Sequence, residues 1–280
     1  MIGAIIGDVV GSRYEFKNYR NKDFPLFHEV STYTDDSVCT IAVADALLDN
    51  YPFDFSEKGL CKLEDDIRNS LISYANKYPD RGYGGRFYNW VFSDLEHKPY
   101  NSCGNGSAMR VSSVAWLANS EEEVKRLARI TAMPTHNHIE GIKGAEAVAM
   151  CIYMARNNKT KNEIKKYIYD NYYPEINYFN YKNLVKYNSF DFTCQGSVPE
   201  AIYCFLISEG FEDALRIAVS IGGDSDTIAC MAGSIAEAYY KNKKNTNRRI
   251  NEFYKRNIIP DEFIEIINIF NEKRSINENN

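Results

Sequence analysis

Apolar residues recur at helical spacing through most of the chain, whereas long alternations of apolar and polar residues are scarce. The clearest stretch is 227–240, in which the apolar positions i, i+3, i+4, i+7, i+8 and i+11 share one helix face. Similar spacing predicts helices near 121–132, 140–156, 161–170 and 261–273, two of them preceded by capping-box sequences. The chain therefore has the pattern of a helical protein.

The stretch 37–49 differs because it is apolar on nearly every side, which is typical of a helix in the middle of a bundle. Pro199 is expected to be the first residue of a further helix. Between about 171 and 198, aromatic and Asn residues abound without a convincing period, so we expect an irregular covering segment. Together these patterns predict an all-α fold, with one compact multi-helix domain over 1–273 and a frayed polar tail over 274–280.

Composition narrows the classes of function. The net charge is -5 and the sequence pI is about 5.5, so no basic surface is expected to hold a nucleic acid. No stretch approaches the roughly 18 apolar residues of a membrane span, and the first residues do not resemble a signal peptide. The 7 cysteines are scattered without a C-x-x-C pair, which indicates reduced and mostly buried thiols. We expect a cytoplasmic protein without membrane contact and, by default, a monomer.

The N-terminal segment combines small residues with acidic ones. Glycine occupies every fourth position from Gly3 to Gly11, which in a helix makes a flat stripe for close packing. If the helix continues, Asp8, Ser12 and Glu15 follow at i, i+4 and i+7 beside that stripe. A solvated polar face is the alternative, but each glycine costs about 1 kcal/mol relative to alanine in a helix, so the stripe favours a packed element.

Two acidic turns stand directly before the most apolar helices, Thr-Asp-Asp-Ser at 34–37 and Gly-Gly-Asp-Ser-Asp-Thr at 222–227. Each turn alone is compatible with an ordinary helix N-cap. A cap needs one oxygen, however, and each turn offers two carboxylates and a threonine hydroxyl. Carboxylates clustered in a small volume repel one another unless cations neutralise them. Hard oxygen ligands without histidine or thiolate favour two Mg²⁺ ions, or Mn²⁺, over zinc.

Further polar elements lie between these turns. Residues 103–110, Cys-Gly-Asn-Gly-Ser-Ala-Met-Arg, form a glycine-containing turn before an expected helix, which is compatible with phosphate binding and equally with an ordinary turn. Residues 81–87 combine glycines with aromatic rings that can stack on a ribose or base. His136 and His138 precede helix 140–156, where hydrogen bonding is a commoner role than metal binding.

These elements, in this order, closely resemble the ADP-ribosylglycohydrolase family over roughly residues 2–240. The resemblance rests on the sequences GAIIGDVVGSRYE, TDDS, RGYGG, GNGSAMRV, THNHIEGIKGA, SVPEAI and GGDSDTIACMAGSIAEA. It implies an all-α globule with a two-magnesium centre at the bottom of a cleft that admits ADP-ribose. Where many relatives have threonine after the paired aspartates this chain has Ser37, which keeps the hydroxyl, so we expect no loss of activity there.

The same resemblance implies roles for particular residues. Glu15 is a mobile acid/base candidate, and Asp35 or Asp36 could share that role. The metal ligands implied are Thr34, Asp35, Asp36, Asp224, Asp226 and Thr227. The substrate contacts implied are Gly84, Gly104, Asn105, Gly106, Ser107, Met109 and His136, most of them around the diphosphate.

The sequence thus predicts a binuclear magnesium-dependent hydrolase that releases ADP-ribose from an N- or O-linked acceptor, either a protein side chain or a small molecule. Glycoside cleavage needs an acid for the leaving group and a base for water. Two alternatives remain open: a non-catalytic ADP-ribose-binding or structural protein, and a two-metal phosphohydrolase that cuts the diphosphate. The released product distinguishes them.

Overall fold

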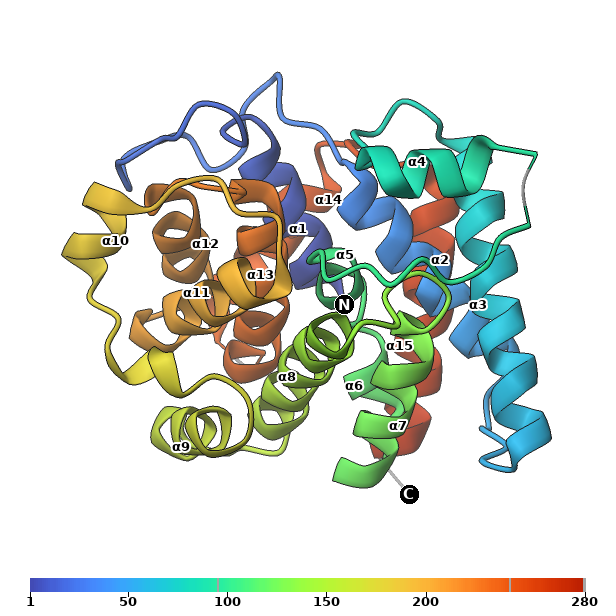
Figure 1. The fold of residues 1–280 in the computed structure, drawn as a ribbon. Helices are drawn as coiled ribbons and strands as arrows, with labels where there is room; N and C mark the ends of the chain where they lie inside the picture. Colours follow the sequence, from blue (N-terminus) through green and yellow to red (C-terminus); the bar gives the residue numbers. More distant parts are fainter. Residues whose placement is uncertain (95, 242, 279–280) are drawn as a thin grey trace.

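We describe the fold from a computed structural model that covers residues 1–94, 96–241 and 243–278. Within these ranges the chain forms helices and turns and no β-strand, so the predicted all-α fold is confirmed. Helices α1 and α13 lie near the centre of the body, with the other helices around them (Figure 1). In chain order the elements are α1 (Ile2–Ser12), α2 (Asp35–Asp49), α3 (Glu57–Lys77), α4 (Gly85–Phe92), α5 (Gly106–Met109), α6 (Val114–Leu117), α7 (Glu121–Ala132), α8 (Ile139–Arg156), α9 (Lys161–Asn171), the short 3₁₀ helix η1 (Pro174–Asn177), α10 (Tyr181–Tyr187), α11 (Cys194–Ile207), α12 (Phe211–Ser220), α13 (Ser225–Tyr240), α14 (Lys244–Tyr254) and α15 (Asp261–Glu278).

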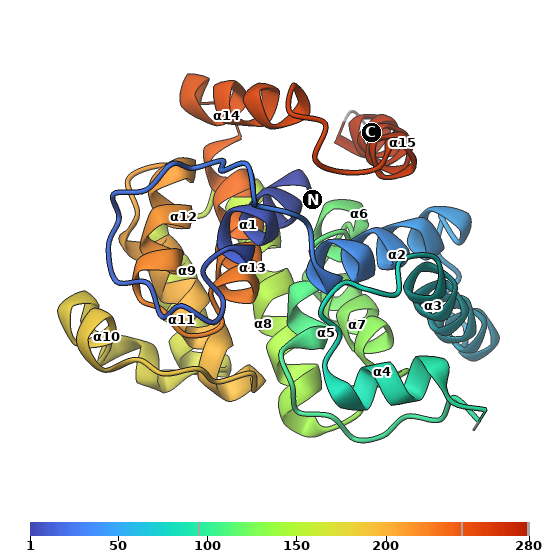
Figure 2. The same ribbon diagram turned by 90° about the horizontal axis from the view of Figure 1, so that it is seen from above.

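Helices α1 and α13 touch through their backbones, side by side in both views (Figures 1 and 2). A Cβ added at Gly3 would lie 2.4 Å from the carbonyl oxygen of Gly233, and one at Gly7 would lie 2.0 Å from that of Ala229. One at Gly11 would meet the first turn of α13 at 2.4 Å. The pairing runs in opposite directions along the two helices, and no side chain fits between them. The glycine stripe therefore serves the close packing that the sequence predicted.

Most of the predicted helices are present, and several begin earlier than expected. Helix α7 has the predicted bounds, and α8 and α9 agree with the prediction to within one residue. Helices α2 and α13 each begin two residues early, at Asp35 and Ser225. The Thr34 side chain accepts the N–H of Asp36 and caps α2, so this helix starts on its acidic residues.

The segment before Pro199 is more regular than the sequence predicted. It contains η1 and α10, and α11 begins at Cys194, so the predicted helix start at Pro199 was wrong. The physical reason is a cap upstream, because the Thr193 side chain accepts the N–H of Gly196. Pro199 consequently lies inside the helix, where its missing N–H costs one backbone hydrogen bond.

The last helix is also longer than predicted. Helix α15 continues to Glu278 instead of ending near 273, so the boundary placed at 274 falls inside a helix. Fraying of the tail stays a prediction, and residues 279–280 lie outside the described part. Helices α14 and α15 lie along the same side of the molecule (Figure 2). None of the described helices has both the length and the apolar content to cross a membrane.

Candidate active site

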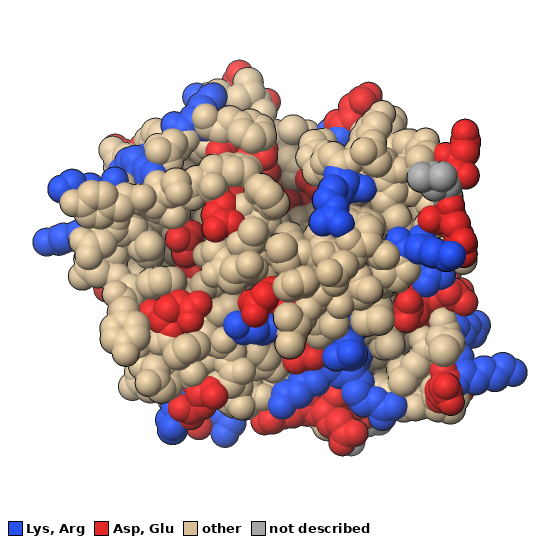
Figure 3. Space-filling model, viewed as in Figure 1, with Lys and Arg blue, Asp and Glu red and all other residues tan. Residues whose placement is uncertain are grey.

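A cavity of about 670 Å³ lies where the acidic turns, the glycine turn before α5 and the start of α4 meet. Figure 3 shows the molecule hollowed at this place, with acidic side chains on one side and a basic side chain across from them. The predicted site residues that line the cavity are Glu15, Asp35, Asp36, Gly84, Gly104, Asn105, Gly106, Met109, His136, Asp224, Asp226 and Thr227. Thr34 and Ser107 belong to the same turns but do not line it.

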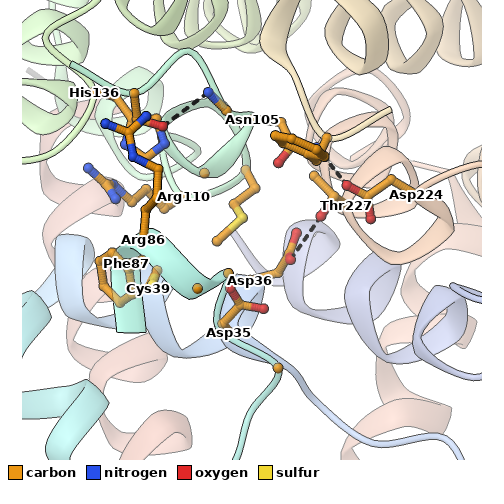
Figure 4. A pocket seen from close by; sticks show the side chains of 18 of the residues that line it. Asp35, Asp36, Cys39, Arg86, Phe87, Asn105, Arg110, His136, Asp224 and Thr227 are labelled. Carbon is orange, nitrogen blue, oxygen red and sulfur yellow. Dashed lines mark hydrogen bonds between the residues drawn. The ribbon is translucent and has the colours of Figure 1, made fainter. Parts of the chain in front are cut away.

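Asp8, fully buried in α1, holds the turn in front of α2. Its carboxylate accepts the N–H of Thr34 at 2.9 Å and the Thr34 hydroxyl at 2.7 Å. It also accepts the N–H of Ser37 at 3.1 Å and the Ser37 hydroxyl. Four donors on one carboxylate fix the start of α2, so Asp35 and Asp36 face the cavity from a rigid turn (Figure 4).

The second acidic turn depends on two consecutive glycines. Gly222 and Gly223 have φ angles of 67° and 77°, a left-handed backbone that side chains disfavour. The turn delivers Asp224 to the N-cap of α13 and Asp226 to its first helical turn. Thr227 joins the two acidic turns, because its hydroxyl donates to Asp36 at 3.0 Å.

Glu15 lines the cavity beside these turns, but it does not lie on α1 as predicted. Helix α1 ends at Ser12, so the expectation that Asp8, Ser12 and Glu15 share one helix face was wrong for Glu15. The glutamate lies in the turn that follows the helix. Ligand oxygens of Glu15, Asp224 and Asp226 nonetheless lie within 4.8 Å of one another. We call Glu15, Asp35, Asp36, Asp224 and Asp226 the acidic end of the cavity.

The acidic end is electrostatically unfavourable by itself. Burial, followed by repulsion from Asp224, raises the pKa of Glu15 to about 7. Burial first and the neighbouring carboxylates second raise the pKa values of Asp35, Asp36 and Asp226 well above the ordinary value. Carboxylates held this close need protons or cations to balance their charge.

One buried oxygen of the acidic end has no hydrogen-bond partner among the described residues. Asp36 is 1% exposed, and its Oδ2 accepts the Thr227 hydroxyl whereas its Oδ1 has no hydrogen-bond partner among the described residues. A buried carboxylate oxygen without a donor is rare in proteins. The side chains of the two acidic turns offer carboxylate and hydroxyl oxygens, which suit a hard divalent cation. The residues present therefore fit the metal centre that the sequence predicted.

The opposite end of the cavity is lined by the turn of residues 104–106, Arg110 and His136, and we call it the anion end. His136 lies against the glycine turn, so that a Cβ added at Gly106 would lie 3.0 Å from its Cε1 and one at Gly104 would lie 3.5 Å from its Nε2. The glycines let the backbone approach the ring. Figure 4 draws His136 and Arg110 across the cavity from Asp35, Asp36 and Asp224.

Asn105 connects the two ends. Its amide donates to Asp224 at 2.7 Å and to Ser197 at 3.1 Å, so both side-chain hydrogens are used within the protein. Asn105 therefore orients Asp224 as well as lining the cavity. Ser107 is fully buried, and its hydroxyl donates to the Gly141 carbonyl at 2.7 Å, so this hydroxyl is used within the protein. The predicted contact of Ser107 with the substrate stays a prediction.

Several lining residues were missed by the sequence analysis. Arg86 lies over the ring of Tyr100 with its Cζ 4.9 Å from the centroid, and both line the cavity. Phe16, Phe190 and Phe192 also line it, and two of them come from the segment expected only to cover the fold. Among these, only Arg86 stood in a motif, and nothing in the spacing of the phenylalanines indicated a cavity.

The sequence model of the ADP-ribosylglycohydrolase family matches residues 1–252. The chain belongs to this family. Its members act as hydrolases on ADP-ribose linkages, and the acidic and anion ends lie within the matched region. A solved structure titled "ADP-ribosylglycohydrolase-related protein complex" has the same fold, with a TM-score of 0.63, 20% sequence identity and coverage of 98% of this chain and 92% of that one.

Named relatives of the family extend over most of the chain. Human ADP-ribosylhydrolase ARH3 is 27% identical, with 86% of this chain and 84% of that protein covered. The Xenopus tropicalis ADP-ribosylhydrolase ARH3 is 26% identical over 86% of this chain and 85% of that protein. ADP-ribosylarginine hydrolase Tri1 of Pseudomonas putida is 21% identical over 86% of this chain and 69% of that protein.

Proposed function

We propose that this protein is a binuclear magnesium-dependent ADP-ribosylglycohydrolase that hydrolyses the glycosidic bond between ADP-ribose and an acceptor and releases ADP-ribose. The observation that carries the proposal is the acidic end: five carboxylates from three separate segments, around a buried Asp36 oxygen without a donor. The acceptor is a protein side chain or a small molecule. We further place the protein in the cytoplasm as a monomer, in keeping with cysteines that are all free.

The ligands proposed for the two cations are Thr34, Asp35, Asp36, Asp224, Asp226 and Thr227. Bound magnesium, or manganese, would supply the positive charge that balances these carboxylates. It would also supply Lewis acidity toward ribose hydroxyls and water. The Thr34 hydroxyl donates to Asp8 and accepts the N–H of Asp36, which leaves one lone pair available toward the cations. Asn105 and Thr227 keep the carboxylates of Asp224 and Asp36 in place through the hydrogen bonds described above.

Proton transfer is assigned to the less buried carboxylates. Glu15 and Asp35 are partly exposed, whereas Asp36, Asp224 and Asp226 are buried. A group that protonates a leaving acceptor or takes a proton from water must reach the open part of the cavity. We therefore assign the acid/base role first to Glu15, with Asp35 and then Asp36 as the other candidates. The anion end would hold the diphosphate against the Gly104–Gly106 turn and His136.

Product analysis tests the proposal. The protein is incubated with arginine-, serine- and acetyl-linked ADP-ribose, with magnesium and with chelator, and the arginine linkage is tested first because one relative is named for it. Metal-dependent release of intact ADP-ribose from one linkage is expected. AMP as product would make the protein a phosphohydrolase, and tight ADP-ribose binding without release from any linkage would make it a binding protein. Asp226→Ala serves as the inactive variant, and Asp170→Ala, an exposed aspartate on α9, is the matched control.

A further inference from the structure

The anion end contains a buried positive charge without an acidic partner. Arg110, which follows α5, is 1% exposed and lines the cavity. Its Nη2 donates to the Thr131 carbonyl at 2.8 Å and to the Thr135 hydroxyl oxygen at 2.9 Å, and its Nε has no partner among the described residues. No ion pair found in the described ranges includes Arg110. A guanidinium stays protonated even when buried, so this charge is permanent.

A second hydrogen bond links Thr135 to His136, which lines the cavity. Thr135 is fully buried, and its hydroxyl oxygen lies 2.7 Å from Nδ1 of His136. The histidine is 4% exposed and lines the cavity. The three side chains thus form a chain of hydrogen bonds from the buried guanidinium to the imidazole. Figure 4 draws its first and last members, Arg110 and His136, on the same side of the cavity.

The direction of these hydrogen bonds follows from the donors available. Arg110 can only donate, so the Thr135 oxygen accepts from it. If His136 Nδ1 also donated to that oxygen, the Thr135 hydrogen would be buried with no acceptor among the described contacts of this hydroxyl. If the hydroxyl instead donates to Nδ1, both the Thr135 hydroxyl and Nδ1 have their hydrogen-bond partners. Nδ1 is then an acceptor, and the proton of the neutral ring is on Nε2.

We propose that Arg110 and Thr135 are positioning residues that hold His136 as a neutral imidazole with its proton on Nε2, turned toward an anionic group of the substrate at the glycine turn. Nε2 lies on the side of Gly104 and Gly106, where added Cβ atoms would be 3.5 Å and 3.1 Å from it. Burial and the charge of Arg110 also hold the pKa of His136 well below its usual range. Arg110 adds a fixed positive charge behind the same anion.

The identification of the anion as the diphosphate of ADP-ribose rests on the proposed function. The prediction of the His136 tautomer does not. Nitrogen-15 NMR of the imidazoles in the full-length protein therefore tests the first part without turnover. The signals of His136 are identified by their loss in His136→Ala. We expect a protonated Nε2 and an unprotonated Nδ1 at neutral pH in the free protein. A proton on Nδ1, or a doubly protonated ring, would overturn the proposal.

Variants of Thr135 test the chain of hydrogen bonds. Thr135→Val removes the hydroxyl and should produce a mixture of tautomers or shift the proton to Nδ1, and Thr135→Ser should restore Nε2–H. Thr131→Val is the matched control, because the Thr131 hydroxyl is equally buried but donates to the Ala128 carbonyl, away from His136. An unchanged His136 tautomer in a folded Thr135→Val protein would refute the role of Thr135.

Calorimetric measurement of ADP binding tests whether the anion is the diphosphate. Thr135→Val should weaken ADP binding about tenfold and leave adenosine binding within about twofold, because adenosine lacks the diphosphate. If the two residues act through one contact, the double variant Thr135→Val/His136→Ala should bind ADP no more weakly than His136→Ala alone. Equal losses for ADP and adenosine, or additive losses in the double variant, would contradict the proposal. Absence of ADP-ribose release with these results intact would count against the proposed function alone.

Discussion

The two ends of the cavity carry charges of opposite sign. At the acidic end, carboxylates from three segments meet, and Asp36 Oδ1 has no donor among the described residues. At the anion end, Thr135 and His136 are joined by hydrogen bonds to a buried guanidinium. The first end collects carboxylates, and the second holds a buried positive charge. With cations bound at the first end, as proposed, a substrate with a diol and a negative group would be aligned by charge along one cavity.

We expect the largest effect when one carboxylate is removed from the acidic end. Asp226→Ala should lower the rate of ADP-ribose release on the order of 10³-fold, because loss of one charged group that acts on the transition state has effects of this size. The same variant without metal should unfold at the same or a higher temperature than the wild type, since it relieves repulsion. Rates are measured by product release and stability by thermal unfolding. A near-normal rate would contradict the assignment.

The scaffold beneath the acidic end offers the next largest effect. A valine at Gly7 would place its Cβ 2.0 Å from the Ala229 carbonyl oxygen and force α1 and α13 apart. We expect a loss of about 3 kcal/mol or more in the free energy of unfolding, at the upper end of what overpacking costs. Gly210→Val is the control, because an added Cβ there has nothing within 4 Å. Equal stability of the two variants in denaturant titrations would show that the glycine stripe is not needed for packing.

Helix starts could be predicted from the sequence better than the pairing of residues across the cavity. Ser120 and Thr160 cap α7 and α9 as their spacing indicated. The acidic turns were also recognisable, because Thr34 and the aspartates stand directly before apolar helices. Such signals are local in the sequence. The prediction for Glu15 used helical spacing and failed in detail, since the helix stops three residues before it.

Contacts between distant residues left no local signal. The bond from Asn105 to Asp224 spans 119 positions, and the contact of Arg110 with Thr135 spans 25. A fully buried arginine without an acidic partner cannot be distinguished in sequence from an exposed one. The early start of α11 was missed for a similar reason, because the Thr193 cap is weaker in sequence than the proline that follows it.

Stabilisation by bound cations should be a smaller effect, and it should differ between variants of the acidic end and of the anion end. Magnesium at 100-fold excess over its dissociation constant should stabilise the wild type by about 2.7 kcal/mol for each site filled, which raises the unfolding temperature by several degrees. Asp36→Asn should lose most of this shift, and Thr135→Val at the anion end should retain it. A magnesium shift of equal size in all three proteins would mean that the cations bind elsewhere.

The smallest expected effect concerns Glu200, a half-buried carboxylate outside the acidic end. Burial raises the pKa of Glu200 to about 7, although its oxygen accepts the Asn188 amide at 2.9 Å. A raised folded-state pKa favours the protonated form, so its contribution to stability is present below the unfolded pKa near 4.5 and is lost as the pH rises through about 7. Glu200→Gln should therefore stabilise the protein more at pH 8 than at pH 5 in thermal unfolding. A pH-independent difference would show that Glu200 does not titrate in this range.

The most direct test of the central claim is the rate of ADP-ribose release before chelation, after chelation and after magnesium is added back, from whichever linkage the protein cleaves. The account predicts loss of release with chelator, recovery with magnesium in the wild type, and no recovery in Asp226→Ala. Release that continues at the same rate in chelator, or that recovers equally in Asp226→Ala, would contradict the assignment of the acidic end as the cation site that drives hydrolysis.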